Sequence, residues 1–537
     1  MLLYCEKDVE LIHSNMDKIL EEINKKSVQI FEPFESEMEK VRNVILDYVK
    51  EKKRKIYGGY ALDLLLKDKS SNDNIYKNNE ISDIDIYSPE PIQDLITICN
   101  RLNTLKFKYV VGSEAIHKDT YNIKVNLTHY CDITYVPKNI YIHLPCKEIN
   151  QLNVVNPYFI MIDYFRMMSD PLVSYKILKE KALNRFYKLQ KYYPLQYMDD
   201  RLVIKSDVDK TIINDITKYI HNKNTLIIIG FLAYNNYLVN SGVLNTKFNK
   251  QKQFALITIP YVEIISVNYK DDTNNLINFL KNKYEITIKE YFPFFQFTGY
   301  STKIYYKTML VAVIYDNDKR SIPYNIIKNK ESELLVGSFS LILMNILINL
   351  NKTYIYKDNH EKKWKIMLSD LIQIRKYYLT KYNKTIMDDT LFRDFTIQCK
   401  GQTQTPTREK ILSYIHKKEK GLRYGFKYNP STNTIESETT YRFSNSSGNE
   451  ILNKKYSKLE DSKDDAKDDL KDDLKDDLKD DSKDDSKDDS KDDSKDDLKD
   501  DLKDDSKDDL KDDLKDGLKD DTKDDLKDDS KDDSKEK

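Results

Sequence analysis

The C-terminal part of the chain repeats a single tetrad, and this repeat limits where a hydrophobic core can form. From Asp461 to the end, the sequence runs Lys-Asp-Asp-(Leu/Ser) almost without interruption. A period of four would place Lys above Lys and Asp above Asp on a helix, where like charges repel, and Asp is a poor helix former. With few apolar residues besides scattered Leu, residues 457–537 are predicted to be a disordered tail. Residues 1–456 must therefore contain the folded body.

The overall charge hides a basic body and an acidic tail. The chain has a formal net charge of −2, but residues 457–537 carry 21 Lys against 38 Asp and Glu, so the body carries +15. A basic body indicates a polyanionic partner. Tyr residues lie among the Lys and Arg residues at 106–109, 188–193 and 375–378. This mixture suits single-stranded nucleic acid, since lysines neutralise phosphates while aromatic rings stack on bases.

Several classes of protein are disfavoured by the sequence. The start, MLLYCEKDVE, does not resemble a secretory signal, so we expect a protein that is not secreted. The most apolar stretch, 334–350, is shorter than the roughly 20 residues that cross a bilayer and contains Ser and Asn, so we expect a buried helix and no membrane partner. Five cysteines without a CxxC pair argue against a disulfide scaffold or a zinc ribbon.

Apolar periodicity predicts an α/β (α+β) protein in which helical and strand-rich segments alternate. Helices are predicted at 8–30, 35–53, 157–192 with a break at Pro171, 334–350, 363–382 and 408–418. Strands are predicted between 55 and 150 and again between 226 and 324, and residues 419–456 are predicted to be loop. The expected domains are 1–54 (N-terminal helices), 55–200 (catalytic), 201–350 (a degenerate copy), 351–456 (helices and loop) and 457–537 (tail).

One segment of the body carries the chemistry. An apolar strand at 55–57 runs into Gly58 and Gly59 and then into a helix, so the backbone can approach a phosphate closely at a helix N-terminus. Asp83 and Asp85 alternate with Ile84 and Ile86, which places both carboxylates on one face of a strand. Asp132 is a lone acid in a second β-rich run.

Taken singly, these features have plainer explanations: a Gly-Gly turn is usually a loop, and an Asp-Ile-Asp strand is usually a solvated sheet face. In this order and context, the three acids predict a site for two divalent cations.

The order Gly-Gly, Asp-x-Asp, Asp resembles the nucleotidyltransferase superfamily, and most closely the poly(A) polymerase catalytic subunits of poxviruses and giant DNA viruses. The resemblance implies a nucleotidyltransferase-type mixed sheet, with Gly58 and Gly59 holding the triphosphate of ATP. It implies that Asp83 and Asp85 bind both Mg²⁺ or Mn²⁺ ions and that Asp132 ligates the ion beside the primer 3′-OH. A basic residue after the sheet, Lys181 or Arg185, is expected to contact the triphosphate. The polar insertion between Leu66 and Ile81 departs from the family pattern and is expected to be a surface loop.

The resemblance also implies a biological setting. The expected function is the addition of a poly(A) tail to mRNA 3′ ends from ATP, in the host cytoplasm at the viral factory and in the virion. The expected partners are a single-stranded RNA 3′ end and a second copy of the chain in a homodimer. A terminal uridylyltransferase, another nucleotidyltransferase, or a non-catalytic RNA-binding protein remain alternatives.

The sequence of the body also predicts an internal duplication, with coincidental α/β patterning as the alternative. Residues 227–233 resemble 55–61, residues 262–266 resemble 82–86, and residues 311–315 resemble 131–135. In this alignment the copy has Glu263, Ile265 and Ala312 in place of the three aspartates. We therefore expect a second nucleotidyltransferase-like domain that cannot hold two cations and that supports RNA binding or subunit contact.

Overall fold

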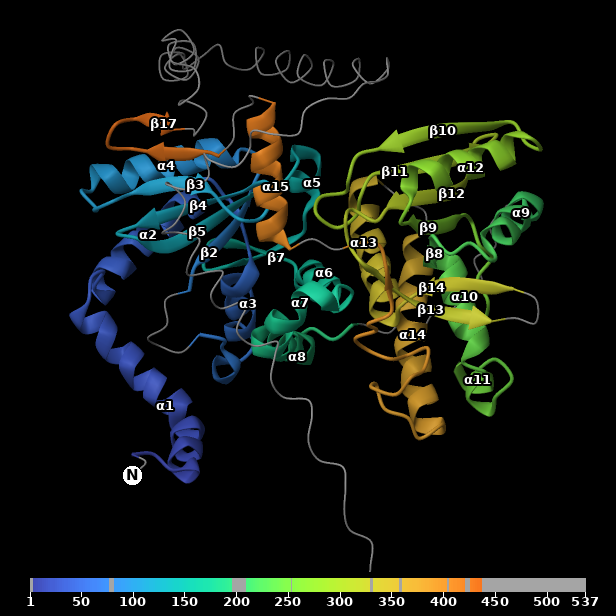
Figure 1. Ribbon diagram of the computed structural model, residues 1–537, viewed down its shortest axis with the longest axis horizontal. Coiled ribbons are helices and arrows are strands. Elements are labelled where there is room, and N and C mark those ends of the chain that lie inside the picture. Colours follow the sequence, from blue (N-terminus) through green and yellow to red (C-terminus); the bar gives the residue numbers. More distant parts are fainter. Residues whose placement is uncertain are drawn as a thin grey trace, which may run out of the picture. The chain divides into compact units, whose positions relative to one another are not determined.

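Figure 1 shows the computed structural model of the chain. The residues that it describes are 3–76, 82–195, 209–252, 254–328, 332–356, 360–402, 405–420 and 425–436. The chain divides into two units, Met1–Ser446 and Ser447–Lys537, and every element below belongs to the first. The predicted tail, 457–537, lies outside the described residues.

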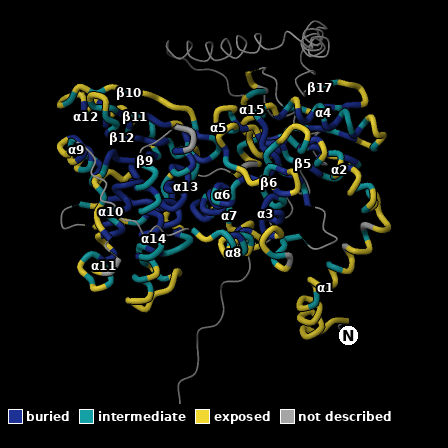
Figure 2. The backbone as a smooth tube through the Cα atoms, turned by 180° about the vertical axis from the view of Figure 1, so that it is seen from behind, coloured by how far each residue is buried: buried dark blue, intermediate teal, exposed yellow. Residues whose placement is uncertain are grey.

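Two helices precede the first sheet, as the apolar periodicity predicts. α1 spans Glu6–Ile30 and α2 spans Glu35–Glu51. α2 buries Val41, Ile45 and Val49 against the core, whereas most of α1 is exposed (Figure 2). α2 is therefore part of the folded body, and α1 leaves much of its apolar surface in solvent.

The first sheet is mixed, with strand order β17-β16-β3-β4-β5-β2-β1-β7-β6. Its strands are β1 (Lys55–Tyr57), β2 (Ile84–Ser88), β3 (Val111–Glu114), β4 (Thr120–Val125), β5 (Thr128–Tyr135), β6 (Cys146–Ile149), β7 (Leu152–Val155), β16 (Lys427–Asn429) and β17 (Thr434–Glu436). The prediction of loop over 419–456 is wrong at β16 and β17, which form a hairpin on the edge of β3. Three-residue strands are too short for an alternation pattern to reveal them, and pairing with a distant strand stabilises them.

Several helices accompany this sheet: those between 58 and 143 lie in the segment predicted to be rich in strands, and those from 157 onward lie in the segment predicted to be helical. They are α3 (Gly58–Lys67), α4 (Pro91–Thr104), α5 (Lys138–His143), α6 (Pro157–Met168), α7 (Pro171–Ile177) and α8 (Leu183–Tyr192), with a short 3₁₀ turn at Ser71–Asp73 and a π-helical turn at Leu178–Ala182. The expected break at Pro171 is confirmed: α6 ends at Met168 and Pro171 opens α7, because proline cannot continue a helix but suits its first turn.

The second sheet repeats the first. Its order is β10-β11-β12-β9-β8-β14-β13-β15, which matches β3-β4-β5-β2-β1-β7-β6 strand for strand apart from the outermost β15. The senses of pairing match as well: β8 is antiparallel to β9 and parallel to β14, as β1 is to β2 and β7. The predicted duplication is thus present in the topology.

The strands of the second sheet are β8 (Leu226–Ile229), β9 (Val262–Ser266), β10 (Ile286–Tyr291), β11 (Ser301–Tyr306), β12 (Met309–Asp316), β13 (Ile322–Lys328), β14 (Glu333–Gly337) and β15 (Cys399–Lys400). Its helices are α9 (Lys210–Ile220), α10 (Gly230–Asn240), α11 (Lys247–Lys252), α12 (Tyr269–Lys281), α13 (Phe339–Tyr356) and α14 (Glu361–Lys381), and α15 (Pro406–Glu419) follows. The predicted helix 334–350 is partly wrong, since Leu334–Gly337 belong to β14. A continuous apolar run looks the same in a buried strand and a buried helix, so periodicity could not place the boundary.

The two sheets share one hydrophobic core, and α6 and α13 pack against each other within it. Ser169 at the end of α6 and Ser340 in α13 bring their hydroxyls to 3.5 Å. The first three turns of α13 are buried on all sides (Figure 2), so this part of the apolar stretch is a core helix, as predicted. Among the described helices, none has the length and apolar character needed to cross a membrane.

Candidate active site

The diglycine turn joins β1 to α3 and lies against Asp85. Gly58 has φ +71°, in the left-handed region that favours glycine. A Cβ at this position would lie 1.9 Å from Asp85 Oδ2, and the backbone N–H of Gly59 donates to the Asp85 carboxylate. The expected free N–H at the start of α3 is therefore already used by an aspartate. Close packing against Asp85 is one reason why glycine stands at position 58.

The three predicted acids lie on adjacent strands. β2 and β5 are parallel neighbours, and Asp85 pairs directly with Asp132 in their register, while Asp83 immediately precedes β2. Burial, followed by the negative charges of Asp83 and Asp132, raises the pKa of Asp85 to about 8. The structure thus places Asp132 on the strand beside Asp83 and Asp85, although it comes from a distant part of the sequence.

His129 belongs to this cluster and was not identified from the sequence. Its Nε2 lies 2.9 Å from Asp132 Oδ1, and its Nδ1 lies 3.9 Å from Asp83 Oδ2. The hydrogen bond to Asp132 is the main cause that raises the pKa of His129. Strict alternation would place residues 129 and 132 on opposite faces of β5. A bulge in the pairing of β4 with β5 shifts the register next to His129. The His129 side chain therefore lies on the same face of the sheet as Asp132.

Tyr76 is a second residue that sequence reasoning missed. A Cβ on Gly59 would lie 2.2 Å from the Tyr76 hydroxyl and 3.1 Å from Arg185 Nη1. Arg185, on α8, therefore reaches the diglycine turn, and its contact with the triphosphate stays a prediction. Lys181 is exposed on the π-helical turn, and no contact among the described residues joins it to the aspartates or glycines.

The described part of the polar insertion is held in place against the body. The backbone N–H of Ile75 donates to Asp63 Oδ1 at 2.7 Å, and Lys188 Nζ donates to the backbone oxygen of Asn74 at 2.9 Å. Asp73 accepts from Lys191 at 2.6 Å and from Tyr192. The insertion is thus not a free surface loop up to residue 76: it packs Tyr76 against α3 and α8.

The donor set suits divalent cations, although the side chains are not yet arranged as a ligand shell. Carboxylate oxygens are the ligands that Mg²⁺ and Mn²⁺ prefer. Burial is the main cause that raises the pKa of Asp85, and the negative charges of Asp83 and Asp132, which a cation would neutralise, add to it. Across the described ranges, no group of three or more His, Cys, Asp or Glu side chains is close enough to hold a metal ion as it stands. The chemistry of Asp83, Asp85 and Asp132 therefore fits a cation, but the three side chains would have to move closer together to hold it, and His129 would have to release Asp132.

Comparisons with known proteins agree with this geometry. Residues 43–174 match the family described as "Poly(A) polymerase catalytic subunit", and residues 187–461 match the family described as "APMV, Putative poly(A) polymerase, catalytic subunit, C-terminal". A relative from Acanthamoeba polyphaga mimivirus, named "Putative poly(A) polymerase catalytic subunit", is 33% identical over 491 residues, 84% of each chain. The chain belongs to the viral poly(A) polymerase catalytic subunit family. The predicted family and enzyme class are confirmed.

Two further comparisons show how far the likeness extends. A crystal structure of the Megavirus polyadenylate synthase superposes with a TM-score of 0.75 at 34% identity, covering 85% of this chain and 90% of that one. A relative from African swine fever virus is 28% identical over 170 residues, which is 30% of this chain and 34% of the relative. The fold is therefore that of the viral polyadenylate synthase.

The second half of the enzyme retains the turn but keeps an acid at only one of the two paired strand positions. Gly230 has φ +61°, and a Cβ there would lie 2.0 Å from Glu263 Oε2, as at Gly58 and Asp85. The strand register pairs Ile229 with Glu263 and Glu263 with Val313, so Glu263 corresponds to Asp85 and Val313 to Asp132. The sequence alignment, which set Glu263 against Asp83, Ile265 against Asp85 and Ala312 against Asp132, was therefore out of register. Repetitive apolar strands do not reveal their own pairing.

The equivalent of Gly59 in the second half is Phe231, whose fully buried ring packs 4.2 Å, centroid to centroid, from the ring of Trp364 on α14. In the second half, aromatic side chains thus occupy the place that the Tyr76 hydroxyl and Arg185 take beside Gly59 in the first half. Glu263 is also fully buried; it accepts from the Tyr315 hydroxyl and from Asn349, each at 3.2 Å. One acid enclosed in this way does not form a two-cation site.

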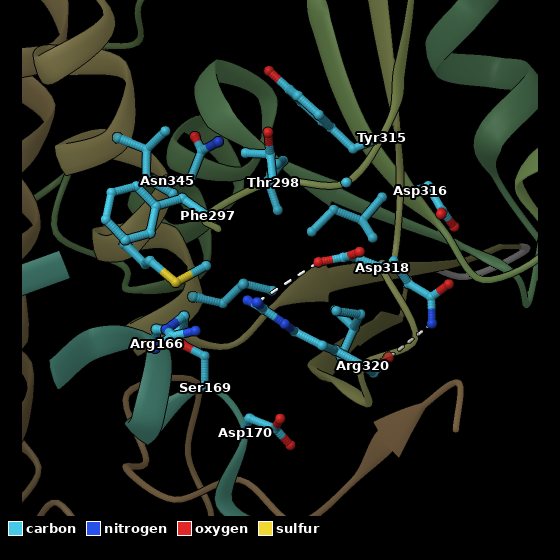
Figure 3. Close-up of a pocket in the computed structure, with 18 of the residues that line it drawn as sticks. Arg166, Ser169, Asp170, Phe297, Thr298, Tyr315, Asp316, Asp318, Arg320 and Asn345 are labelled. Atoms are coloured by element: carbon cyan, nitrogen blue, oxygen red, sulfur yellow. Dashed lines mark hydrogen bonds and ion pairs between the residues drawn. The ribbon is translucent and has the colours of Figure 1, made fainter. Parts of the chain in front are cut away.

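A cavity lies beside this degenerate site (Figure 3). Arg166 of α6 and Tyr315, Asp318, Arg320 and Asn345 of the second half are among its lining residues. Arg320 lies 3.6 Å from Asp318, and much of the remaining wall is apolar. None of the three aspartates of the first half lines this cavity, so we do not assign the reaction to it.

Proposed function

We propose that the enzyme adds adenylate from ATP to RNA 3′ ends, with two Mg²⁺ or Mn²⁺ ions held by Asp83, Asp85 and Asp132. The observation that carries the proposal is the register of β2 and β5, which sets Asp85 opposite Asp132 beside the diglycine turn. When bound, such a cation pair lowers the pKa of an attacking hydroxyl and neutralises the charge of the leaving pyrophosphate. Family membership supports the choice of a polyadenylating reaction.

The residues of the chain then have separate tasks. Asp132 and its partner His129 stand at the side of Asp85 that faces away from β1, where the primer hydroxyl would bind. On the other side, the turn at Gly58 and Gly59, together with Arg185, would receive the triphosphate, because a guanidinium and a helix N-terminus both attract phosphate oxygens.

The test is extension of an RNA primer with each nucleoside triphosphate and Mg²⁺. Wild type should extend the primer with ATP, and Asp83→Ala/Asp85→Ala should not. The matched control is Asp47→Ala/Asp389→Ala, which removes two aspartates with 73% and 98% side-chain exposure, and it should behave as wild type. Preferential use of UTP would make the enzyme a terminal uridylyltransferase, and extension by the double aspartate variant would refute the assigned site.

We also propose that the enzyme acts in the host cytoplasm, at the viral factory, and in the virion. We propose in addition that it is a homodimer. Support for the dimer comes from α1, which leaves an apolar stripe of heptad spacing 37% to 54% exposed: Val9, Ile12, Met16, Ile19 and Ile23. An antiparallel copy would set acidic Glu6 and Asp8 against Lys25 and Lys26. Light scattering should show that Ile12→Asp/Ile19→Asp is monomeric; a wild-type monomer would refute this.

A further inference from the structure

Two lysines and two tyrosines form a cluster on one face of the second sheet, which we call the β10–β11 surface: Lys289 and Tyr291 on β10, and Lys303 and Tyr305 on β11. β10 and β11 are antiparallel, and Lys289 pairs directly with Lys303 in their register. Directly paired residues point to the same face of a sheet, and so do residues two apart along a strand. The four side chains therefore share one face.

Helix α12 covers the opposite face. There the Tyr269 hydroxyl lies 2.6 Å from Thr302 Oγ1, and Ile304, which neighbours Lys303 in the strand, is fully buried. Lys289 and Tyr291 are exposed, and most of β10 is exposed (Figure 2). Lys303 and Tyr305 on β11 are half-buried, so the β10–β11 surface is open to solvent mainly along β10, and the other face of these strands packs against α12.

Among the described residues, the two lysines of this surface contact aromatic rings and no acid. Lys303 Nζ lies 4.4 Å from the ring centroid of Tyr291, and Lys289 Nζ lies 5.5 Å from that of Tyr305. In the described part of the chain, neither lysine forms an ion pair with an acid. The only acid on β10, Glu290, points to the other face. Like charges directly opposite each other destabilise a sheet, so this pair is costly unless an anion binds to it.

The aromatic surface continues beyond the cluster. Phe292 and Tyr300, at the end of the β10–β11 hairpin, have 74% and 51% of their surfaces exposed, and their ring centroids are 5.9 Å apart. Exposed rings interleaved with lysines are the combination that binds single-stranded nucleic acid, because rings stack on bases and ammonium groups neutralise phosphates.

The first half of the enzyme has no such feature at the equivalent place. By sheet register, Ser113 and Asn122 occupy the positions of Lys289 and Lys303, and they form a neutral hydrogen bond of 2.6 Å. The hairpin of β16 and β17 covers the edge of β3, whereas β10 is the last strand of its sheet. The duplicated half thus has one enclosed acid, Glu263, and carries a basic, aromatic surface that the first half lacks at the equivalent place.

We propose that the β10–β11 surface binds single-stranded RNA, as a second contact for the strand whose 3′ end is extended in the first half. This inference rests on the proposed function, since it takes RNA as the substrate. It assigns the catalytically degenerate half a role in holding the strand.

The test measures RNA binding without catalysis. The full chain is titrated with a fluorescently labelled single-stranded RNA in EDTA, without ATP, over a range of salt concentrations. For Lys289→Ala/Lys303→Ala, the slope of log Kd against log salt should fall by about 1.4, since each phosphate contact on a single strand contributes about 0.7. Tyr291→Ala/Tyr305→Ala should weaken binding by a factor of about 5 or more, with the slope unchanged.

The matched control is Lys270→Ala/Lys281→Ala, which removes two exposed lysines of α12 and should keep the wild-type slope. Equal slopes and affinities for the two lysine variants would overturn the inference. So would equal binding of duplex RNA, or a change of oligomeric state in Lys289→Ala/Lys303→Ala, which would make the surface a contact between copies. Because binding is read without ATP, a wild type that binds RNA here but does not extend it would refute the proposed function alone.

Discussion

Replacing Gly58 by alanine tests whether the position of Asp85 is essential, and the structure sets the size of the effect. The backbone at Gly58 has φ +71°, which costs an alanine about 1–2 kcal/mol. The new Cβ would lie 1.9 Å from Asp85 Oδ2, so the carboxylate must move and the hydrogen bond from Gly59 is lost, which costs about 0.5–1.5 kcal/mol more. We expect Gly58→Ala to lower the free energy of unfolding by about 1.5–3.5 kcal/mol in total.

The second half contains a matched control for this change. At Gly230, φ is +61° and a Cβ would lie 2.0 Å from Glu263 Oε2, so Gly230→Ala should carry a similar loss of stability. The two variants should differ in activity, because only Gly58→Ala displaces a carboxylate of the proposed cation site.

Urea denaturation gives the stability of each variant, and primer extension is then measured at a temperature where both are folded. Under these conditions we expect Gly58→Ala to lose at least about 100-fold in kcat, the scale expected when a group that acts in the transition state is displaced, and Gly230→Ala to keep wild-type activity. Full activity in folded Gly58→Ala, or an equal loss in folded Gly230→Ala, would show that the placement of Asp85 does not control the reaction.

Three further changes probe other parts of the enzyme. Tyr76→Phe removes the hydroxyl that lies 3.5 Å from Arg185, so the KM for ATP should rise several-fold while kcat changes little; an unchanged KM would separate Tyr76 from ATP binding. Burial raises the pKa of Glu263 above its ordinary 4.5, so the folded state of wild type loses stability as the pH rises above that value. Glu263→Gln cannot ionise, so the difference between its free energy of unfolding and that of wild type, measured by urea denaturation, should grow in favour of the variant from pH 4 to pH 8. A difference that stays constant over this range would contradict the raised pKa of Glu263. Phe231→Ala should cost about 3–5 kcal/mol of stability, measured in the same way, without lowering the primer extension of the folded protein, because the ring lies in the degenerate half.

Local sequence patterns were sufficient for the elements that they specify directly. Alternation in Asp83-Ile84-Asp85-Ile86 predicted which carboxylates share a face, and Pro171 predicted the break between α6 and α7. These features depend on the geometry of a few consecutive residues, which the chain carries wherever it folds.

Features that depend on pairing between distant segments were wrong or missed. The hairpin at 427–436 was predicted as loop, because only the edge of β3 makes it a pair of strands. The second copy was aligned out of register, because Val262–Ser266 is apolar throughout and gives no sign of which residue faces Val313. When every residue of a strand is apolar, a shift of its register against the neighbouring strand leaves the sequence pattern unchanged.

The sequence alone therefore determined the identity of the acids, the glycine turn and the succession of helices and strands, since each follows from short-range backbone geometry. Only the tertiary structure decided that His129 reaches Asp132, through a bulge that alternation cannot foresee, and that Tyr76 lies over Gly59, through anchors on α3 and α8. These contacts join residues from separate elements, and their formation depends on how sheet and helices pack, which no local pattern encodes.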